Sequence, residues 1–187
     1  MLVTLLIGLA IGIITAFIIL TITLPTKVQY IETVDVLAPV SRVYDAIRYQ
    51  EQLMEWSAWP SETNSQCSVK GNDGQVGAQT TYFQKEKQFG YQEVTGLIGN
   101  ELVSFYLTSD APFEQDTRLH FWLKEVGTDK TRVALWFDNT LKKPSHVLPY
   151  VFGIIRWTHQ MHLKDLAGLK HYVENTTKAN LHRAGVA

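Results

Sequence analysis

The opening residues constrain this chain most, because they contain an uncharged apolar stretch of membrane-spanning length. "LVTLLIGLAIGIITAFIILTITL", from Leu2 to Leu24, runs for 23 residues without Asp, Glu, Lys or Arg. At about 1.5 Å per residue a helix of this length extends about 34 Å, which exceeds the roughly 30 Å hydrocarbon core of a bilayer. Its polar side chains are threonines, whose hydroxyls bond to carbonyls of their own helix in lipid. We therefore predict a single transmembrane helix within residues 1–26.

A cleaved secretory signal is the main alternative reading of this stretch. Such a signal has a basic start, a shorter apolar core and a small-residue cleavage site. Here no Lys or Arg precedes the stretch, and its exit "TLPTKVQY" has Pro25, which ends a helix, in place of an Ala-x-Ala site. A buried core helix, the third reading, would need covering on every side. We therefore favour an uncleaved membrane anchor.

The positions of the basic residues and of the cysteine indicate a compartment. Lys27, Arg42 and Arg48 follow the apolar stretch, whereas only the α-amino group precedes it. Because basic residues concentrate on the cytoplasmic side of membrane helices, we expect a single-pass membrane protein whose soluble domain faces the cytoplasm. Cys67 is the single cysteine and forms no internal disulfide, which suits a reducing compartment.

All charged side chains lie beyond the apolar stretch and nearly balance. The 17 Lys and Arg face 18 Asp and Glu. A nucleic-acid-binding protein usually has an excess or a cluster of basic residues, so we predict no nucleic-acid partner. The length after the anchor suits a single domain, which we place at 27–175. The small and polar residues 176–187 are predicted to form a flexible tail.

Residue patterns predict a strand, a helix, several strands and a long final helix. "VQYIETVDVLA" alternates, which predicts a strand from Val28 to Leu37. Next, "PVSRVYDAIRYQEQLMEW" places apolar side chains on one helical face. Short connections containing Gly, Asn or Asp indicate that the strands after it form an antiparallel meander. These strands are predicted at "AQTTYFQ", "GYQEVTGLI", "ELVSFYLT", "TRLHFWLKEV" and "TRVALWFD", with "EKQFG", "GNE" and "GTDK" as connections.

The final segment predicts a long amphipathic helix that starts near Gly153 and ends near Glu174. Its periodic side chains recur at spacings of three and four residues and are Ile155, His159, His162, Leu166, Leu169 and Val173. Helices gathered on one face of an antiparallel sheet define the α+β class. We therefore expect a helix-grip fold, in which a curved antiparallel sheet wraps around the long C-terminal helix and leaves an internal space.

Four stretches, in this order and spacing, resemble the START/Bet v 1-like (SRPBCC) superfamily and, within it, the polyketide cyclase/dehydrase-like group. They span Val28 to Glu174 and are "VDVLAPVSRVYDAI", "LMEWSAWPS", "DGQVGAQTTY" and "HLKDLAGLKHYVE". The resemblance implies that an apolar or amphipathic ligand is held between the sheet and the long helix. The N-terminal anchor distinguishes this chain from soluble members.

Signals for catalysis, metals or cofactors are weak. His159 and His162 share a helix face, but the sequence places no third or fourth ligand, so we predict no metal. Cys67 lacks a visible activating group. "GNDGQVG" leads into a strand and lacks the Lys-Ser/Thr of a phosphate loop, so we predict a turn and no cofactor. His120 alternates with Leu119 and Phe121, which places it on the outer face of the sheet. Catalytic residues remain unassigned and whether the chain is an enzyme stays open, with the balance against it.

Aromatic side chains concentrated in the predicted sheet and the helices before it are the strongest functional signal. Most of them belong to an ordinary core, but apolar ligand pockets are also built from aromatic walls with a few polar groups. The leading hypothesis is a membrane-anchored binding domain for a lipid, a quinone or a polyketide-like molecule. A polyketide cyclase/dehydrase-type enzyme and a non-catalytic, membrane-tethered partner-binding protein remain alternatives. The residues predicted to line the cavity are Trp56, Trp59, Tyr82, Tyr91, Tyr106, Phe121 and His159.

Overall fold

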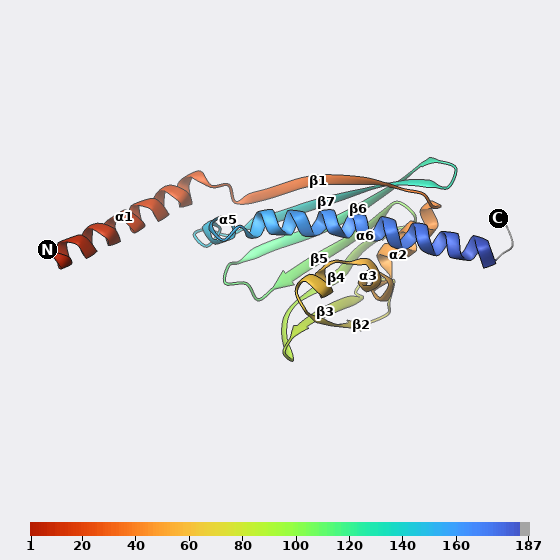
Figure 1. Ribbon diagram of the computed structural model, residues 1–187, viewed down its shortest axis with the longest axis horizontal. Helices are drawn as coiled ribbons and strands as arrows, with labels where there is room; N and C mark the ends of the chain where they lie inside the picture. Colours follow the sequence, from red (N-terminus) through yellow and green to blue (C-terminus); the bar gives the residue numbers. More distant parts are fainter. Residues whose placement is uncertain (184–187) are drawn as a thin grey trace.

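A seven-stranded antiparallel sheet and the long helix packed against it organise the computed structural model, which describes residues 1–183 and the side chains of residues 1–176 (Figure 1). The strand order is β1-β7-β6-β5-β4-β3-β2. The strands are β1 (Lys27–Val36), β2 (Gln66–Lys70), β3 (Gln79–Gln84), β4 (Lys87–Ile98), β5 (Leu102–Ser109), β6 (Gln115–Gly127) and β7 (Lys130–Leu141). The helices are α1 (Leu2–Thr23), α2 (Val40–Arg48), α3 (Gln50–Trp56), α4 (Trp59–Glu62), α5 (Val147–Val151) and α6 (Ile154–Arg183). This is the α+β helix-grip fold expected from the sequence.

The apolar stretch forms one continuous helix, α1, which projects from the domain (Figure 1). None of its 22 residues is buried. Thr21 and Thr23 donate their hydroxyl hydrogens to helix carbonyls four residues earlier, as the sequence predicts. The helix ends before Pro25, because Leu24 already has an extended backbone. In the described part of the chain, α1 is the one helix long and apolar enough to cross a membrane.

The pleat of the central strands separates a buried inner face from an outer face. On β6, Leu119, Phe121 and Leu123 are buried in the core. His120 points to the outer face, as predicted, where its Nδ1 lies 2.8 Å from the Ser104 hydroxyl and its ring lies tilted beside that of Trp136, with centroids 5.2 Å apart. The core therefore fills the space between the inner face of the sheet, α2, α3 and α6.

The predicted apolar stripe of α6 packs into this core. Leu166, Leu169 and Val173 are buried there. Gly168 allows close approach to α3, because a Cβ at this position would lie 2.2 Å from the Trp56 carbonyl oxygen. The Trp56 indole in turn donates to the Ala46 carbonyl at 2.8 Å, which ties α3 to α2. Gly153 has a φ of +68°, and this left-handed residue separates α5 from α6.

Three features differ from the sequence reading. The sequence reading has no strand at β2, which is short. The connection predicted at "EKQFG" is mostly strand, because Lys85 and Glu86, both at positive φ, turn the chain in two residues. Helix α6 continues past Glu174 to Arg183, since no Gly or Pro interrupts the sequence between Gly168 and Gly185. Residues 184–187 of the predicted tail lie outside the described residues.

Candidate functional site

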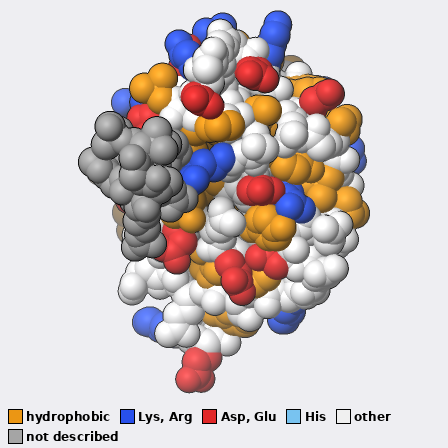
Figure 2. Space-filling model, turned by 90° about the vertical axis from the view of Figure 1, so that its right-hand side faces the viewer, with side chains coloured by type: hydrophobic (Ala, Val, Ile, Leu, Met, Phe, Trp, Pro, Cys, Tyr) orange, Lys and Arg blue, Asp and Glu red, His pale blue; other side chains and the backbone are white. Residues whose placement is uncertain are grey.

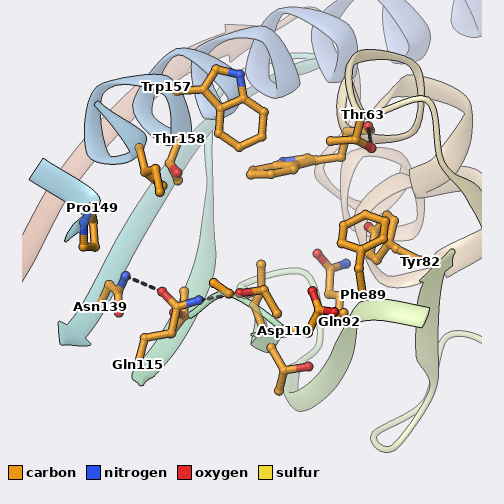
Figure 3. A pocket seen from close by; sticks show the side chains of 18 of the residues that line it. Thr63, Tyr82, Phe89, Gln92, Asp110, Gln115, Asn139, Pro149, Trp157 and Thr158 are labelled. Atoms are coloured by element: carbon orange, nitrogen blue, oxygen red, sulfur yellow. Dashed lines mark hydrogen bonds between the residues drawn. The ribbon is translucent and has the colours of Figure 1, made fainter. Parts of the chain in front are cut away.

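A cavity of about 320 Å³ lies between the inner face of the sheet and the first part of α6 (Figure 3). Strands β3 to β7 form its floor, and α4, α5 and α6 cover it. These elements come from distant parts of the chain, so the cavity depends on the tertiary fold. Its apolar lining consists of Trp59, Tyr82, Phe89, Leu107, Phe113, Phe137, Pro149, Ile154, Ile155 and Trp157.

Two tryptophans from different helices form the wall nearest α6. The rings of Trp59 and Trp157 meet edge to face with centroids 5.2 Å apart. The Trp59 Nε1–H donates to Asp165 Oδ2 at 3.0 Å, so this indole offers the cavity an apolar surface. Asp165 also accepts bonds from the Ala58 amide at 2.8 Å and the Ser57 hydroxyl at 3.1 Å. Burial raises the pKa of Asp165 to about 7, and these hydrogen bonds oppose the rise.

Polar side chains gather at one end of the cavity floor. Asn139 Nδ2 donates to Gln115 Oε1 at 3.1 Å, and Gln115 Nε2 donates to the Ser109 hydroxyl at 2.9 Å (Figure 3). Thr117 pairs with Asn139 across β6 and β7. The Thr117 hydroxyl and Asn139 Oδ1 are buried without a hydrogen-bond partner among the described residues. A buried polar atom without a partner costs about 1–3 kcal/mol, so this end of the cavity holds unused hydrogen-bonding capacity.

The buried His162 forms another part of the wall, and the half-buried Tyr30 contacts it from β1. The Tyr30 hydroxyl lies 2.7 Å from Nδ1 of His162, whose side chain is fully buried beside Phe137. Burial, and then the nearby His159, lower the pKa of His162 to about 3, and burial raises that of Tyr30. Both groups are therefore neutral at pH 7.

The contact with Tyr30 uses one of the two ring nitrogens of His162 and leaves the other free. A neutral imidazole has one N–H donor and one acceptor nitrogen. Nε2 of His162 is buried and has no partner in the described part of the chain. His162 thus has an unused ring nitrogen at the wall of the cavity.

The structure brings three of the predicted site residues together and places four elsewhere. Trp59, Tyr82 and Tyr91 line the cavity. Trp56 and Phe121 pack against each other in the core, with ring centroids 6.3 Å apart. Tyr106 pairs with Arg118 on the outer face of the sheet, because it alternates with the buried Phe105. His159 faces β1, where its Nε2 lies 2.7 Å from Glu32 Oε1.

Sequence reasoning did not select several important lining residues. Phe89 and Phe137 are strand aromatics whose inward direction depends on register, which the sequence alone leaves open. The signal that identifies the α6 wall is the spacing of Ile154, Thr158 and His162, which recur every four residues and all line the cavity. No cluster of three or more His, Cys, Asp or Glu side chains suited to a metal occurs among the described residues.

The cavity opens near the end of the domain from which α1 leaves. Most of its lining is at least partly buried, but Ser109, Asp110 and Trp157 are exposed. The opening therefore lies between the β5–β6 connection and the first turn of α6. Both elements are at the same end of the molecule as α5 and the junction of α1 with β1 (Figure 1).

Comparison with known proteins supports the fold. The sequence matches no protein-family model and no curated protein. Solved structures match the domain over most of their length. A norcoclaurine synthase point mutant from Thalictrum flavum, in complex with a transition state analogue, aligns with a TM-score of 0.59 at 11% identity, over 81% of this chain and 96% of that chain. TTHA0849 from Thermus thermophilus aligns with a TM-score of 0.56 at 16% identity, over 80% of this chain and 99% of that chain.

A third solved structure is major latex-like protein 151 from Panax ginseng, which aligns with a TM-score of 0.51 at 13% identity, over 81% of this chain and 98% of that chain. Identities this low show a shared fold and leave function open. The domain that follows α1 thus has the α+β helix-grip fold of Bet v 1-like proteins.

Proposed function

We propose that this chain is a membrane-tethered binding protein for a hydrophobic or amphiphilic small molecule, held between the sheet and α6. The observation that carries the proposal is the aromatic-lined cavity of about 320 Å³ that opens at the α1 end of the domain. Its volume lies at the lower end of the range of about 300–1,000 Å³ typical of ligand sites. A lipid segment, a quinone head or a polyketide-like ring system has the shape and polarity for such a site.

The lining supports an amphiphile rather than a fully apolar ligand. Removing apolar surface from water supplies most of the binding free energy, at about 25 cal/mol per Å². The spare polar atoms of Thr117, Asn139 and His162 would orient a ligand that carries both hydrogen-bond donors and acceptors. A hydroxyl or carboxylic acid group meets this requirement, whereas a quinone supplies acceptors alone and a plain hydrocarbon leaves these atoms without partners.

The proposed role of α1 is to hold the domain at a bilayer in which such a ligand is dissolved. A tether raises the effective concentration of the binding site beside a ligand that partitions into lipid. The basic residues after α1 favour a domain on the cytoplasmic side. No soluble carrier is then needed between the membrane and the site.

An enzyme of the polyketide cyclase/dehydrase type is the second candidate, favoured by the contact between Tyr30 and His162, which lines the cavity. A neighbour in fold, norcoclaurine synthase, is itself an enzyme. The lowered pKa of His162 argues for the binding role, because an imidazole with a pKa of about 3 is a weak base at neutral pH. The third alternative, a partner-binding protein, does not require an open cavity.

Filling the cavity tests the binding role. Thr158→Trp should abolish saturable binding of a fluorescent fatty acid or quinone analogue by the full-length protein in detergent, because the new indole occupies the cavity. The matched control is Gln160→Trp, which adds the same side chain on the exposed side of α6 and should leave binding unchanged. Equal binding by both variants, with unchanged melting temperatures, would show that the ligand does not occupy this cavity.

Alkaline extraction tests the anchor. The full-length protein should stay in the membrane pellet after carbonate treatment, because α1 presents only apolar and threonine side chains over its 22 residues. A Gly12→Arg, Ile13→Arg double variant should shift the protein toward the soluble fraction, since each arginine at the helix centre costs about 2.5–3.5 kcal/mol on insertion. Release of the unaltered protein, or a mature N-terminus near Lys27, would contradict the anchor.

A further inference from the structure

We propose that an apolar corner of the domain, formed by Val151, Phe152 and Trp157, inserts into the membrane surface beside α1 and sets the cavity opening against lipid. This inference rests on the proposed membrane-spanning role of α1. Its occupant is the bilayer itself, and the corner is built from α5, the residues that join it to α6, and the first turn of α6.

The corner exposes large apolar side chains that the fold leaves unused. Val151 is 61% exposed, Phe152 71% and Trp157 44%. Val147 and Pro149 of α5 are buried, whereas Val151 and Phe152, just before the left-handed Gly153, are exposed. Tryptophan is also the residue enriched at membrane–water interfaces, where its indole is half in lipid and half in water.

The connection to α1 places this corner at the membrane boundary. Three residues separate Thr23, the last residue of α1, from Lys27, the first of β1. Fully extended, they span about 10 Å. The Tyr150 hydroxyl donates to the Pro25 carbonyl at 3.0 Å, which fixes α5 to this connection. Because Tyr150 immediately precedes Val151, the corner lies close to the end of α1 and therefore to the headgroups.

Charges around the corner are compatible with a lipid surface. The nearby acidic side chains are engaged, since Asp110 pairs with Lys87 and Glu114 with Lys142. Lys143 and Arg156, by contrast, have no carboxylate partner among the described residues. Each such cation near an anionic leaflet contributes about 1 kcal/mol of attraction. At the opposite end of the molecule, acidic and basic side chains are scattered among the hydrophobic ones (Figure 2).

This placement gives the cavity a direct route to the bilayer. Trp157 belongs both to the corner and to the exposed rim of the cavity. With Trp157 at the headgroup level, the opening between the β5–β6 connection and α6 meets lipid. A ligand dissolved in the bilayer then enters without exposing its apolar surface to bulk water, which is unfavourable.

A fluorophore at the corner tests the proposal in the full-length protein. In a Cys67→Ser background, Phe152→Cys is labelled with an environment-sensitive dye and reconstituted into phosphatidylcholine vesicles, with or without bromine on the acyl chains. The label should show a blue-shifted emission and bromolipid quenching that correspond to a depth of about 5–10 Å in the interface. The matched control is Val126→Cys, which is also apolar and exposed but lies near the β6–β7 turn. It should show neither effect.

Equal, water-like emission from residues 152 and 126 would overturn the docking proposal. The readout is independent of ligand binding, which the Thr158→Trp variant measures in detergent. The variant Phe152→Asp further separates membrane docking from ligand binding. It should slow transfer of the fluorescent fatty acid from vesicles into the protein while leaving equilibrium binding in detergent unchanged. Transfer at the unaltered rate would contradict the proposed route, and loss of binding in detergent for the unaltered protein would instead contradict the proposed function.

Discussion

Leu166→Asp is expected to unfold the domain. Leu166 is 4% exposed and packs from α6 into the main core. The substitution removes a buried apolar side chain, at about 2–5 kcal/mol, and adds a carboxylate that must be buried without a partner or protonated. Together these losses approach the total stability of about 5–15 kcal/mol of an ordinary domain. Circular dichroism of the full-length variant in detergent should show no cooperative thermal transition.

Leu163→Asp provides the control for this prediction. Leu163 precedes Leu166 by one helical turn but is 37% exposed, so its aspartate stays solvated. Both variants carry the same change in helix propensity and charge, and they differ in burial. The control should fold with a melting temperature within a few degrees of the unaltered protein. A folded Leu166→Asp variant with an unchanged transition would refute the packing of α6 on the sheet.

The overall architecture was predictable because periodicity reports which side of an element is buried. The alternation around Phe121 and the helical stripe of Leu166, Leu169 and Val173 each identify the inner face without knowledge of the fold. The short strand β2 and the turn at Lys85 and Glu86 were not predictable. Five residues give too little pattern for a strand, and residues other than glycine at positive φ are uncommon.

The candidate site was less predictable, because a cavity is a property of several elements at once. Trp56 and Trp59 are close in sequence, yet α3 buries Trp56 against Phe121, while α4 places Trp59 at the cavity. The sequence does not show that break between helices. The polar end of the cavity likewise depends on the register of β6 against β7, which sets Thr117 opposite Asn139. Register follows from tertiary packing and turn geometry, not from composition.

Two buried ionisable groups on α6 should make stability depend on pH in opposite directions. The pKa of His162 falls from 6.5 to about 3 on folding, so the unfolded chain binds a proton that the folded chain refuses as the pH drops below 6.5. The stability contributed by neutral His162 is therefore present above pH 6.5 and is lost progressively down to about pH 3. The loss is about 1.4 kcal/mol per pH unit.

Asp165 contributes a pH dependence of stability with the opposite sign. Its pKa rises from 3.8 to about 7 on folding, so the folded chain retains a proton that the unfolded chain releases. Its contribution is present below pH 3.8 and is lost as the pH rises through about 7. Between about pH 4 and pH 6.5 the two slopes nearly cancel, and these two groups leave the stability of the unaltered protein almost flat.

Single substitutions should reveal the dependence of stability on pH that each of these two groups contributes. His162→Gln keeps a neutral hydrogen-bonding side chain for Tyr30 but removes the histidine titration. This variant should lose about 3 kcal/mol of stability between about pH 4.5 and pH 6.5, because over this interval Asp165 stays protonated in the folded chain and is ionised in the unfolded chain. Asp165→Asn should show the reverse, with stability rising over the same interval.

Free energies of unfolding from urea titrations of the full-length proteins in detergent measure both. The slope is the readout, because either substitution also changes the absolute stability through its own hydrogen bonds. Parallel pH curves for the unaltered protein and the His162→Gln variant would mean that His162 is hydrated enough to take up a proton at its usual pH, which is incompatible with a dry cavity wall beside Phe137.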